Sequence, residues 1–140
     1  MQARIPKPTH DFKRKPKPEG FDDPGHLAKI RLCPCCICGM VPADPHHLLS
    51  TEERRKRGLR VDALCIPLCR RHHDELHFKS GNEEAYLAEN GVDGRGLARA
   101  LYSIRRKTIQ HYQAVVFAHY QRAVLKRRFA AVPSTERDET

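Results

Sequence analysis

The residue types best suited to chemistry lie between residues 65 and 77, in the segment C-I-P-L-C-R-R-H-H-D-E-L-H. Within it, Cys69 and His72 are separated by two residues, a spacing that supplies half of a tetrahedral zinc site. His73 and His77 stand four residues apart, so on a helix their imidazoles lie one above the other and could share one ion. The segment therefore predicts ligands for two separate ions.

The other half of the zinc site is expected in a cysteine cluster upstream. Cys35 and Cys38 also have two residues between them, and Gly39 lets the chain turn so that both thiolates face one ion. Cys33 with Cys36 is the competing pair, which has the same spacing but no glycine directly behind it. A third interpretation is that these residues are buried structural thiols. The sequence favours a structural zinc with four ligands: Cys35, Cys38, Cys69 and His72.

Two strands and a helix are needed to position these ligands. Residues 63–68 predict a strand, which runs into a helix over about residues 70–78. Residues 41–49 predict a second short strand, broken by two prolines, that carries His46 and His47. Adjacent strand residues point to opposite faces, so these two histidines cannot simply chelate one ion together. We expect one of them to bind a metal and the other to serve a different role.

Composition limits the protein to one modest domain. The chain has 140 residues, of which 39% are hydrophobic, and no tryptophan. Its net charge of +9 and its isoelectric point near 9.5 predict a polyanionic partner, most commonly nucleic acid and not a membrane. Because the sequence shows neither a signal peptide nor an apolar run that could span a bilayer, we expect a cytoplasmic protein. The six cysteines are then expected as metal ligands or thiols and not as disulfides.

Basic and polar segments surround the central region. Residues 1–23 are rich in Lys, Arg and Pro, and predict a disordered arm that either has no role or attracts phosphate. Residues 50–60 form a polar connection that is either a solvated loop or a phosphate contact. Residues 132–140 predict a disordered tail. The connection contains five basic residues: Arg54, Arg55, Lys56, Arg57 and Arg60.

The region after residue 80 predicts two helices. Residues 80–83 resemble a capping box, in which Ser80 opens a short helix that ends near Gly91. Residues 94–131 then predict one long helix, because their apolar residues form a stripe at helical spacing. Its other face is expected to be basic, because the segment contains no acidic residue. This helix could grip DNA or pair with another chain. Its basic residues are Arg95, Arg99, Arg105, Arg106, Lys107, Arg122, Lys126, Arg127 and Arg128.

Together these motifs resemble the HNH (ββα-metal) endonuclease superfamily. In chain order they are C-x2-C-G at residues 35–39, D-P-H-H-L at residues 44–48, Asp62, and I-P-L-C-x2-H-H-x3-H at residues 66–77. The pattern is most similar to the small phage-type subgroup that includes the recombination-enhancing Ref nucleases. Such families clasp one catalytic metal between a β-hairpin and a helix, with a zinc knuckle at the hairpin ends. The resemblance implies an α+β fold with its core over residues 24–93.

The resemblance also implies roles for single residues. His46, His73 and His77 would bind the catalytic ion, and His47 would be the general base that deprotonates a water. The ion would polarise the phosphate and stabilise the leaving group. Imidazole suits Zn²⁺, Ni²⁺, Mn²⁺ or Co²⁺, whereas Mg²⁺ usually prefers oxygen, and the sequence does not choose among them. Asp62 stands where many members have Asn; it can orient the base by accepting hydrogen bonds but cannot donate one.

The expected function follows from these implied roles. The protein would be a metal-dependent DNA endonuclease that hydrolyses phosphodiester bonds by a single-ion HNH mechanism. The alternative is a non-catalytic, zinc-stabilised module that binds DNA. The alternative is less favoured because a structural zinc needs none of four histidines: His46, His47, His73 and His77.

Overall fold

The structure, a computed structural model, describes residues 19–49, 60–79 and 82–132. In these ranges the chain forms five α-helices, one 3-10 helix and a two-stranded sheet, so the fold belongs to the α+β class. No helix in these ranges combines the length and the apolar character that a membrane span requires. The elements in chain order are α1 (Pro24–Arg31), β1 (Asp44–His47), η1 (Asp62–Leu64), β2 (Cys65–Leu68), α3 (Arg70–Lys79), α4 (Glu83–Glu89), α5 (Gly94–Ser103) and α6 (Ile109–Ala131).

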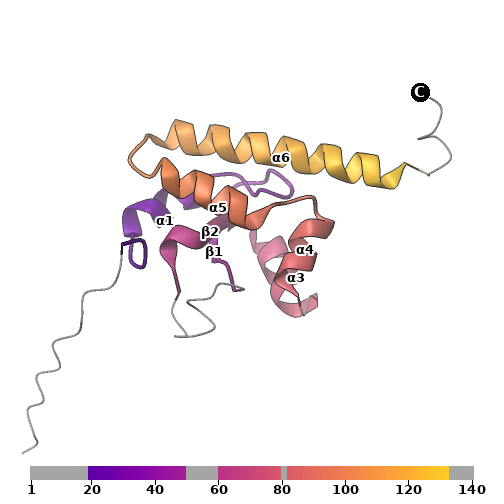
Figure 1. The fold of residues 1–140 in the computed structure, drawn as a ribbon, viewed down its shortest axis with the longest axis horizontal. Helices are drawn as coiled ribbons and strands as arrows, with labels where there is room; N and C mark the ends of the chain where they lie inside the picture. Colours follow the sequence, from indigo (N-terminus) through magenta and orange to yellow (C-terminus); the bar gives the residue numbers. More distant parts are fainter. Residues whose placement is uncertain (1–18, 50–59, 80–81, 133–140) are drawn as a thin grey trace, which may run out of the picture.

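The antiparallel pair β1 and β2 lies at the centre of the molecule (Figure 1). The pairing places Asp44 opposite Leu68 and His47 opposite Cys65. All four residues of β2 are buried, in agreement with its apolar sequence. Because alternate residues face opposite sides of a strand, His46 is buried while His47 stays partly exposed. Helix α3 follows β2 after one intervening residue, so strand and helix ligands lie close together.

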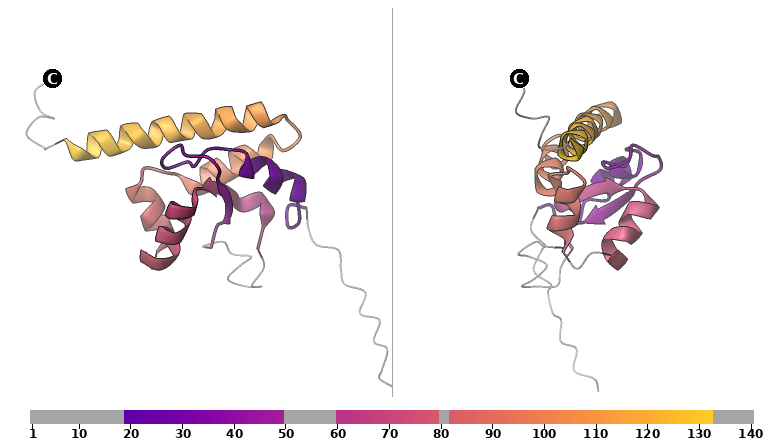
Figure 2. Two further views of the ribbon diagram at one scale, coloured as in Figure 1. Left: turned by 180° about the vertical axis from the view of Figure 1, so that it is seen from behind. Right: turned by 90° about the vertical axis from the view of Figure 1, so that its right-hand side faces the viewer.

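The C-terminal region differs from the single helix that the sequence predicts over residues 94–131. A turn at residues 104–108 separates α5 from α6, and the two helices pack against each other (Figure 2). The Nζ of Lys29 donates hydrogen bonds to the carbonyls of Arg105 and Lys107, at 2.6 and 2.8 Å, and thereby stabilises the turn. Folding back buries apolar side chains of both helices in one core, which a straight helix would leave in water.

The apolar and basic side chains of α6 are less well separated on the helix surface than the sequence predicts. Tyr112, Val116 and Ala123 are fully buried and join the same core as the apolar residues of α5. The helix also exposes large apolar side chains, among them Phe117 and Phe129. The predicted apolar stripe is therefore present, but the outer surface of α6 is mixed and not purely basic.

Residues 19–23, which the sequence analysis assigned to the basic arm, belong to the described part of the chain. Residues 1–18 of the expected arm lie outside the described residues. Phe21, however, is only 7% exposed. The carbonyl of Gly20 accepts a hydrogen bond from the backbone N–H of Ala63 at 2.8 Å. An apolar ring and a backbone pairing thus attach this segment to the 3-10 turn η1.

The helix start predicted at Ser80 is also displaced. Ser80 lies outside the described residues, and Asn82 is the residue that caps α4, accepting a 3.1 Å hydrogen bond from the N–H of Ala85. Asn is as good an N-cap as Ser because its side-chain oxygen satisfies the same free N–H groups. The basic connection at residues 50–59 and the tail at residues 133–140 lie outside the described part of the chain.

Candidate metal centres

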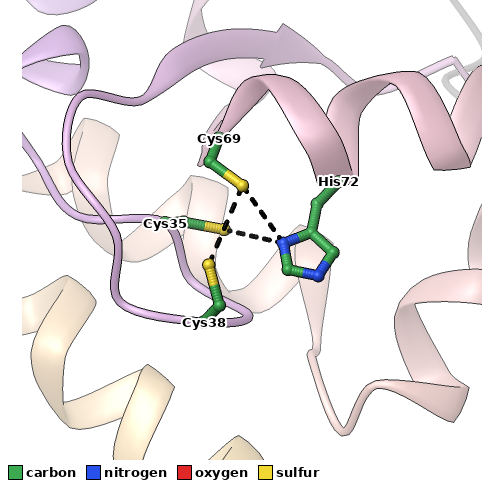
Figure 3. A group of neighbouring side chains, drawn as sticks. All are labelled: Cys35, Cys38, Cys69 and His72. Atoms are coloured by element: carbon green, nitrogen blue, oxygen red, sulfur yellow. Dashed lines mark hydrogen bonds between the residues drawn. The ribbon is translucent and has the colours of Figure 1, made fainter.

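Three cysteines and a histidine gather between the loop after α1 and the start of α3 (Figure 3). The Sγ atoms of Cys38 and Cys69 are 3.7 Å apart, and Nδ1 of His72 lies 3.5 Å from the Sγ of Cys35 and 3.2 Å from that of Cys69. Tetrahedral zinc, with bonds of about 2.3 Å to sulfur and about 2.0 Å to nitrogen, would separate such atoms by roughly 3.5 to 3.8 Å. The cluster can therefore hold a metal such as zinc.

The loop that presents the first two thiols is shaped by its own backbone. Cys35 N–H donates to the carbonyl of Met40, and Gly39 N–H donates to the carbonyl of Cys35, both at 2.8 Å. Gly39 has a φ of +74°, and a Cβ there would lie 3.2 Å from the ring of Tyr120 on α6. Glycine is needed both for the left-handed turn and for the close approach of α6.

The competing pair Cys33 and Cys36 stays outside this cluster. Cys33 donates its thiol to the carbonyl of Lys29 at 3.4 Å, and both cysteines are fully buried. Burial raises the pKa of Cys33 to about 12, so it remains a thiol. Burial also raises the pKa of Cys35 to about 11, so an ion that binds there must displace a proton.

A second cluster lies where β1 faces α3. One ligand nitrogen from each of His46, His73 and His77 lies within 4.8 Å of the others. His46 is buried and His77 is exposed, so the cluster is closed on one side and open on the other. Burial, assisted by the nearby His46, lowers the pKa of His73 and favours its neutral, ligand form. The buried Nδ1 of His73 makes no hydrogen bond within the described residues, and Oδ1 of Asp74 lies 3.7 Å from it. These features fit three ligands for an ion.

His47 is held by a carboxylate. Its Nε2 lies 2.7 Å from Oδ1 of Asp62. The other oxygen of Asp62 accepts a 2.8 Å hydrogen bond from the N–H of Asp23, and Asp23 in turn caps α1 through the N–H of His26. Cys65 lies close enough to join them, but burial raises the pKa of its thiol. The arrangement is a hydrogen-bonded His and Asp pair that uses Nε2 of His47 and leaves Nδ1 outside this contact.

The histidines open into a cavity of about 190 Å³. Exposed Arg60 lines this cavity beside His46 and His47, so a cation stands next to both histidine groups. A larger cavity of about 370 Å³, next to α4 and lined partly by Lys126 of α6, contains none of these histidines. The smaller cavity is the one that brings together the predicted histidine ligands, the predicted base and a cation.

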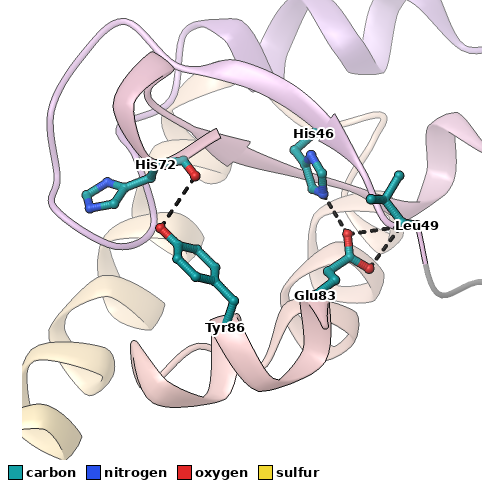
Figure 4. A network of polar contacts seen from close by, with 5 residues as sticks. All are labelled: His46, Leu49, His72, Glu83 and Tyr86. Carbon is teal, nitrogen blue, oxygen red and sulfur yellow. Dashed lines mark hydrogen bonds and ion pairs between the residues drawn. The ribbon is translucent and has the colours of Figure 1, made fainter. Parts of the chain in front are cut away.

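Helix α4 contributes a carboxylate that the sequence analysis did not identify (Figure 4). Oε1 of Glu83 lies 2.6 Å from Nε2 of His46, and both carboxylate oxygens accept from the N–H of Leu49. One turn further on, the hydroxyl of Tyr86 lies 3.0 Å from Oε2 of Glu75 and 3.4 Å from the carbonyl of His72, both on α3. Helix α4 therefore contacts a residue of each cluster. His46 and Glu83 are 37 residues apart, and such a contact leaves no local pattern.

Comparison with known proteins gives a family. Residues 4–101 match the family described as "Protein of unknown function (DUF968)", which is more than half of the chain. The chain belongs to the DUF968 family. It is 33% identical over 97 residues to the "Uncharacterized protein YdfU" of Escherichia coli strain K12. That stretch is 69% of this chain but only 28% of YdfU, so the chain spans under a third of this relative. No solved structure matches significantly.

The DUF968 match includes both clusters, Asp62 and Glu83, whereas α6 lies beyond its end. The structure brings the predicted zinc ligands into one group and the three predicted histidine ligands into another. The predicted base lies beside the second group and lines the same cavity. In all, the sequence singled out eight site residues: Cys35, Cys38, Cys69, His72, His46, His73, His77 and His47.

Proposed function

We propose that this DUF968 protein is a metal-dependent DNA endonuclease with a core of the HNH (ββα-metal) type. The observation that carries the proposal is the pairing of His47 with Asp62 beside a group of three histidines. A hairpin and the helix after it supply both features, while a separate cysteine cluster accounts for a structural zinc. Four histidines that the zinc does not need, gathered in one cavity, indicate a catalytic site.

In the proposed reaction, His47 removes a proton from the attacking water. Asp62 accepts the hydrogen bond from Nε2–H, which leaves Nδ1 to take the proton, and its charge stabilises the imidazolium that forms. His46, His73 and His77 would hold one divalent ion, which when bound supplies positive charge to the phosphate and the leaving oxygen. Because all three ligands are neutral when they bind, they leave the charge of the ion undiminished.

The charge distribution supports a polyanionic substrate. The chain carries a net charge of +9, and Arg60 lines the histidine cavity, where it could contact a phosphate. The basic residues of α5, α6 and their turn are not all available, because some have partners that the sequence did not reveal. Six remain exposed: Arg99, Arg106, Lys107, Arg122, Lys126 and Arg128.

Three basic residues in this region have structural partners. Arg95 pairs with Glu84 at 3.0 Å and Arg105 with Glu19 at 2.5 Å, so acidic residues from elsewhere in the chain contact this segment although it contains none itself. Arg127 donates to two backbone carbonyls, which ties α6 to the loop of the cysteine cluster and to the end of α4. We therefore assign DNA attraction to the six exposed residues and to Arg60.

A plasmid nicking assay tests the proposal. Zinc-loaded protein would be incubated with supercoiled plasmid, without further metal or with added Mn²⁺, Ni²⁺ or Mg²⁺, and with His47→Ala as the matched variant. We expect conversion to nicked or linear DNA only with an added ion, and much slower conversion by His47→Ala. A protein that binds the plasmid but leaves it supercoiled with every ion would instead be a non-catalytic zinc module.

A further inference from the structure

Glu83 is unusual among the acidic residues at the start of α4. It is only 8% exposed, whereas its neighbour Glu84 is exposed and pairs with Arg95 on the surface. Burying a carboxylate costs free energy unless it is fully hydrogen-bonded. Hydrogen bonds from His46 and from the N–H of Leu49 offset this cost for Glu83. A residue at the first turn of a short helix has no need of such burial for the sake of the helix alone.

The contact with Glu83 selects one nitrogen of His46. An ionised carboxylate can only accept, so Nε2 of His46 carries the proton in their 2.6 Å hydrogen bond. In a neutral imidazole the remaining nitrogen, Nδ1, then keeps its lone pair. A carboxylate that holds one nitrogen of a histidine in this way fixes the ring and strengthens the other nitrogen as a ligand.

Helix α4 is itself fixed at three points, so it can hold Glu83 in place. Asn82 caps its start, and Tyr86 bonds to the backbone of α3 at His72. At its end, Gly91 adopts a φ of +76°, and a Cβ there would meet the backbone of Ala123 on α6 at 2.8 Å. The helix therefore contacts α3, α6 and His46, so its packing sets the position of Glu83.

We propose that Glu83 is the positioning residue for the ion of the histidine cluster: it holds Nε2 of His46, so that Nδ1 binds the ion together with His73 and His77. This inference rests on the proposed function for its catalytic meaning, but ion binding can be measured without it. Glu83 acts through His46 and is not itself a ligand. Removing the Glu83 side chain should weaken the binding of the ion to the histidine cluster and leave the structural zinc in place.

Calorimetric titration with Ni²⁺ gives the first test. Zinc-loaded parent protein would be compared with Glu83→Ala, Glu83→Gln and the matched surface control Glu84→Gln. We expect the Ni²⁺ dissociation constant of Glu83→Ala to rise about 10- to 100-fold. Glu83→Gln should lose less Ni²⁺ affinity, because its amide oxygen can still accept a hydrogen bond from Nε2–H of His46. The Ni²⁺ affinity of Glu84→Gln should equal that of the parent. If Glu83→Ala does not fold, Glu83→Gln carries the test by itself.

Zinc content and thermal melting separate positioning from a general structural role. Glu83→Gln should keep one structural zinc per chain and melt close to the parent. Unchanged Ni²⁺ affinity in Glu83→Gln and in any folded Glu83→Ala would overturn the inference. So would a loss of Ni²⁺ binding that occurs only together with loss of zinc.

Nitrogen NMR of the histidine rings gives a readout that stability does not affect. Both clusters would be filled with excess Zn²⁺, which is diamagnetic, and His46 would be assigned by the signal missing from His46→Gln. The expected state is a metal-bound Nδ1 and a protonated Nε2. A metal-bound Nε2 would show that Glu83 does not hold this ring in the ion complex, and the inference would be abandoned.

Nicking assays on the same proteins keep the two proposals apart. At low Ni²⁺ or Mn²⁺, Glu83→Gln should cut more slowly than the parent and should recover in part as the ion concentration rises, whereas Glu84→Gln should match the parent throughout. If the parent never cuts DNA but Glu83→Gln still binds Ni²⁺ more weakly than the parent does, the endonuclease proposal fails and the role of Glu83 stands. If the parent cuts DNA and Glu83→Gln binds Ni²⁺ as tightly as the parent does, the endonuclease proposal stands and the positioning role of Glu83 fails.

Discussion

The two clusters share helix α3 but differ in enclosure. The cysteine cluster has four ligand residues, of which Cys35, Cys69 and His72 are buried. The histidine cluster has three, and they range from the buried His46 to the exposed His77. Four protein ligands complete a tetrahedron, whereas three leave positions open for water or substrate. The difference indicates one closed site suited to holding the fold together and one open site suited to reaction.

Helix geometry explains how α3 can serve both clusters. Successive residues on a helix point about 100° apart, so the adjacent His72 and His73 face different directions. His73 and His77 return to the same face one turn later. A shift of one residue along α3 would disrupt both groups, and the two sites are therefore fixed relative to each other by a single helix.

The largest expected effect comes from opening the closed cluster. Cys69→Ser should give an unfolded or aggregated protein without stoichiometric zinc, because zinc binding contributes on the order of 10 kcal/mol while domains are stable by only about 5–15 kcal/mol. Elemental analysis and circular dichroism would measure this. Cys33→Ala is the matched control, since Cys33 is buried outside the cluster and its removal should leave zinc content unchanged. A stable, zinc-free Cys69→Ser protein would show that the cysteine cluster does not hold the fold together.

The next effect separates the base from the ligands of the open cluster. His47→Ala should fold, bind Ni²⁺ and bind DNA, but cut plasmid about 10² to 10⁴ times more slowly. Single-turnover nicking at several ion concentrations would measure the rate. Added metal should not restore it. Cutting at the parent rate, or rescue by metal, would make His47 a bystander or a ligand.

A smaller effect should follow from removing the exposed ligand. His77→Ala should keep its structural zinc and its fold, because its side chain is exposed. Its Ni²⁺ dissociation constant should rise at least about tenfold, since a direct ligand matters no less than an outer partner. Calorimetry would measure the affinity, and nicking at high Ni²⁺ should recover in part. His77→Ala with unchanged affinity would remove this residue from the open cluster.

The smallest effect concerns a histidine that belongs to neither cluster. His26 is buried, and its Nδ1 lies 2.6 Å from the hydroxyl of Tyr112. Burial lowers the pKa of His26 despite Asp23 and Asp62, while Lys29 and Arg105 lower it further. The unfolded chain, with a pKa of about 6.5, binds the proton more readily. His26 therefore costs stability as the pH falls below about 6.5 towards its lower folded pKa.

His26→Phe should remove this pH dependence. At pH 7 the variant should be about 1–3 kcal/mol less stable, because the Tyr112 hydroxyl loses its partner. Between pH 7 and pH 5 it should lose less stability than the parent. Urea unfolding of the zinc-loaded proteins would measure both. Parallel losses in the two proteins would show that His26 does not titrate on folding, and would leave the acid sensitivity to the metal clusters.

The sequence predicted most residues of the two clusters because their pairs are local, whereas His46 was assigned only through the resemblance to the HNH superfamily. Two-residue gaps between Cys35 and Cys38 and between Cys69 and His72, and a four-residue step on α3, can be read without a fold. The partners of these residues could not be read in the same way. Asp62 reaches Asp23 across 39 residues and Glu83 reaches His46 across 37, so only the packed chain reveals those contacts.

The break between α5 and α6 shows a different limit. Residues 104–108 contain neither Gly nor Pro, and their three basic residues favour a helix. Local propensity therefore predicts continuity, but burial of the facing helices and the contacts of Lys29 decide otherwise. The α+β class was within reach of pattern reasoning, whereas the antiparallel return of α6 was not.

The place where family similarity stops is not the edge of the folded unit. The match ends at Leu101, a fully buried residue, and the core is completed by Tyr112, Val116 and Ala123 of α6. A fragment cut at the end of the match would expose Leu97 and Leu101 to water and release the tie that Arg127 makes to the cysteine loop. Domain limits for producing this protein are therefore better set after α6.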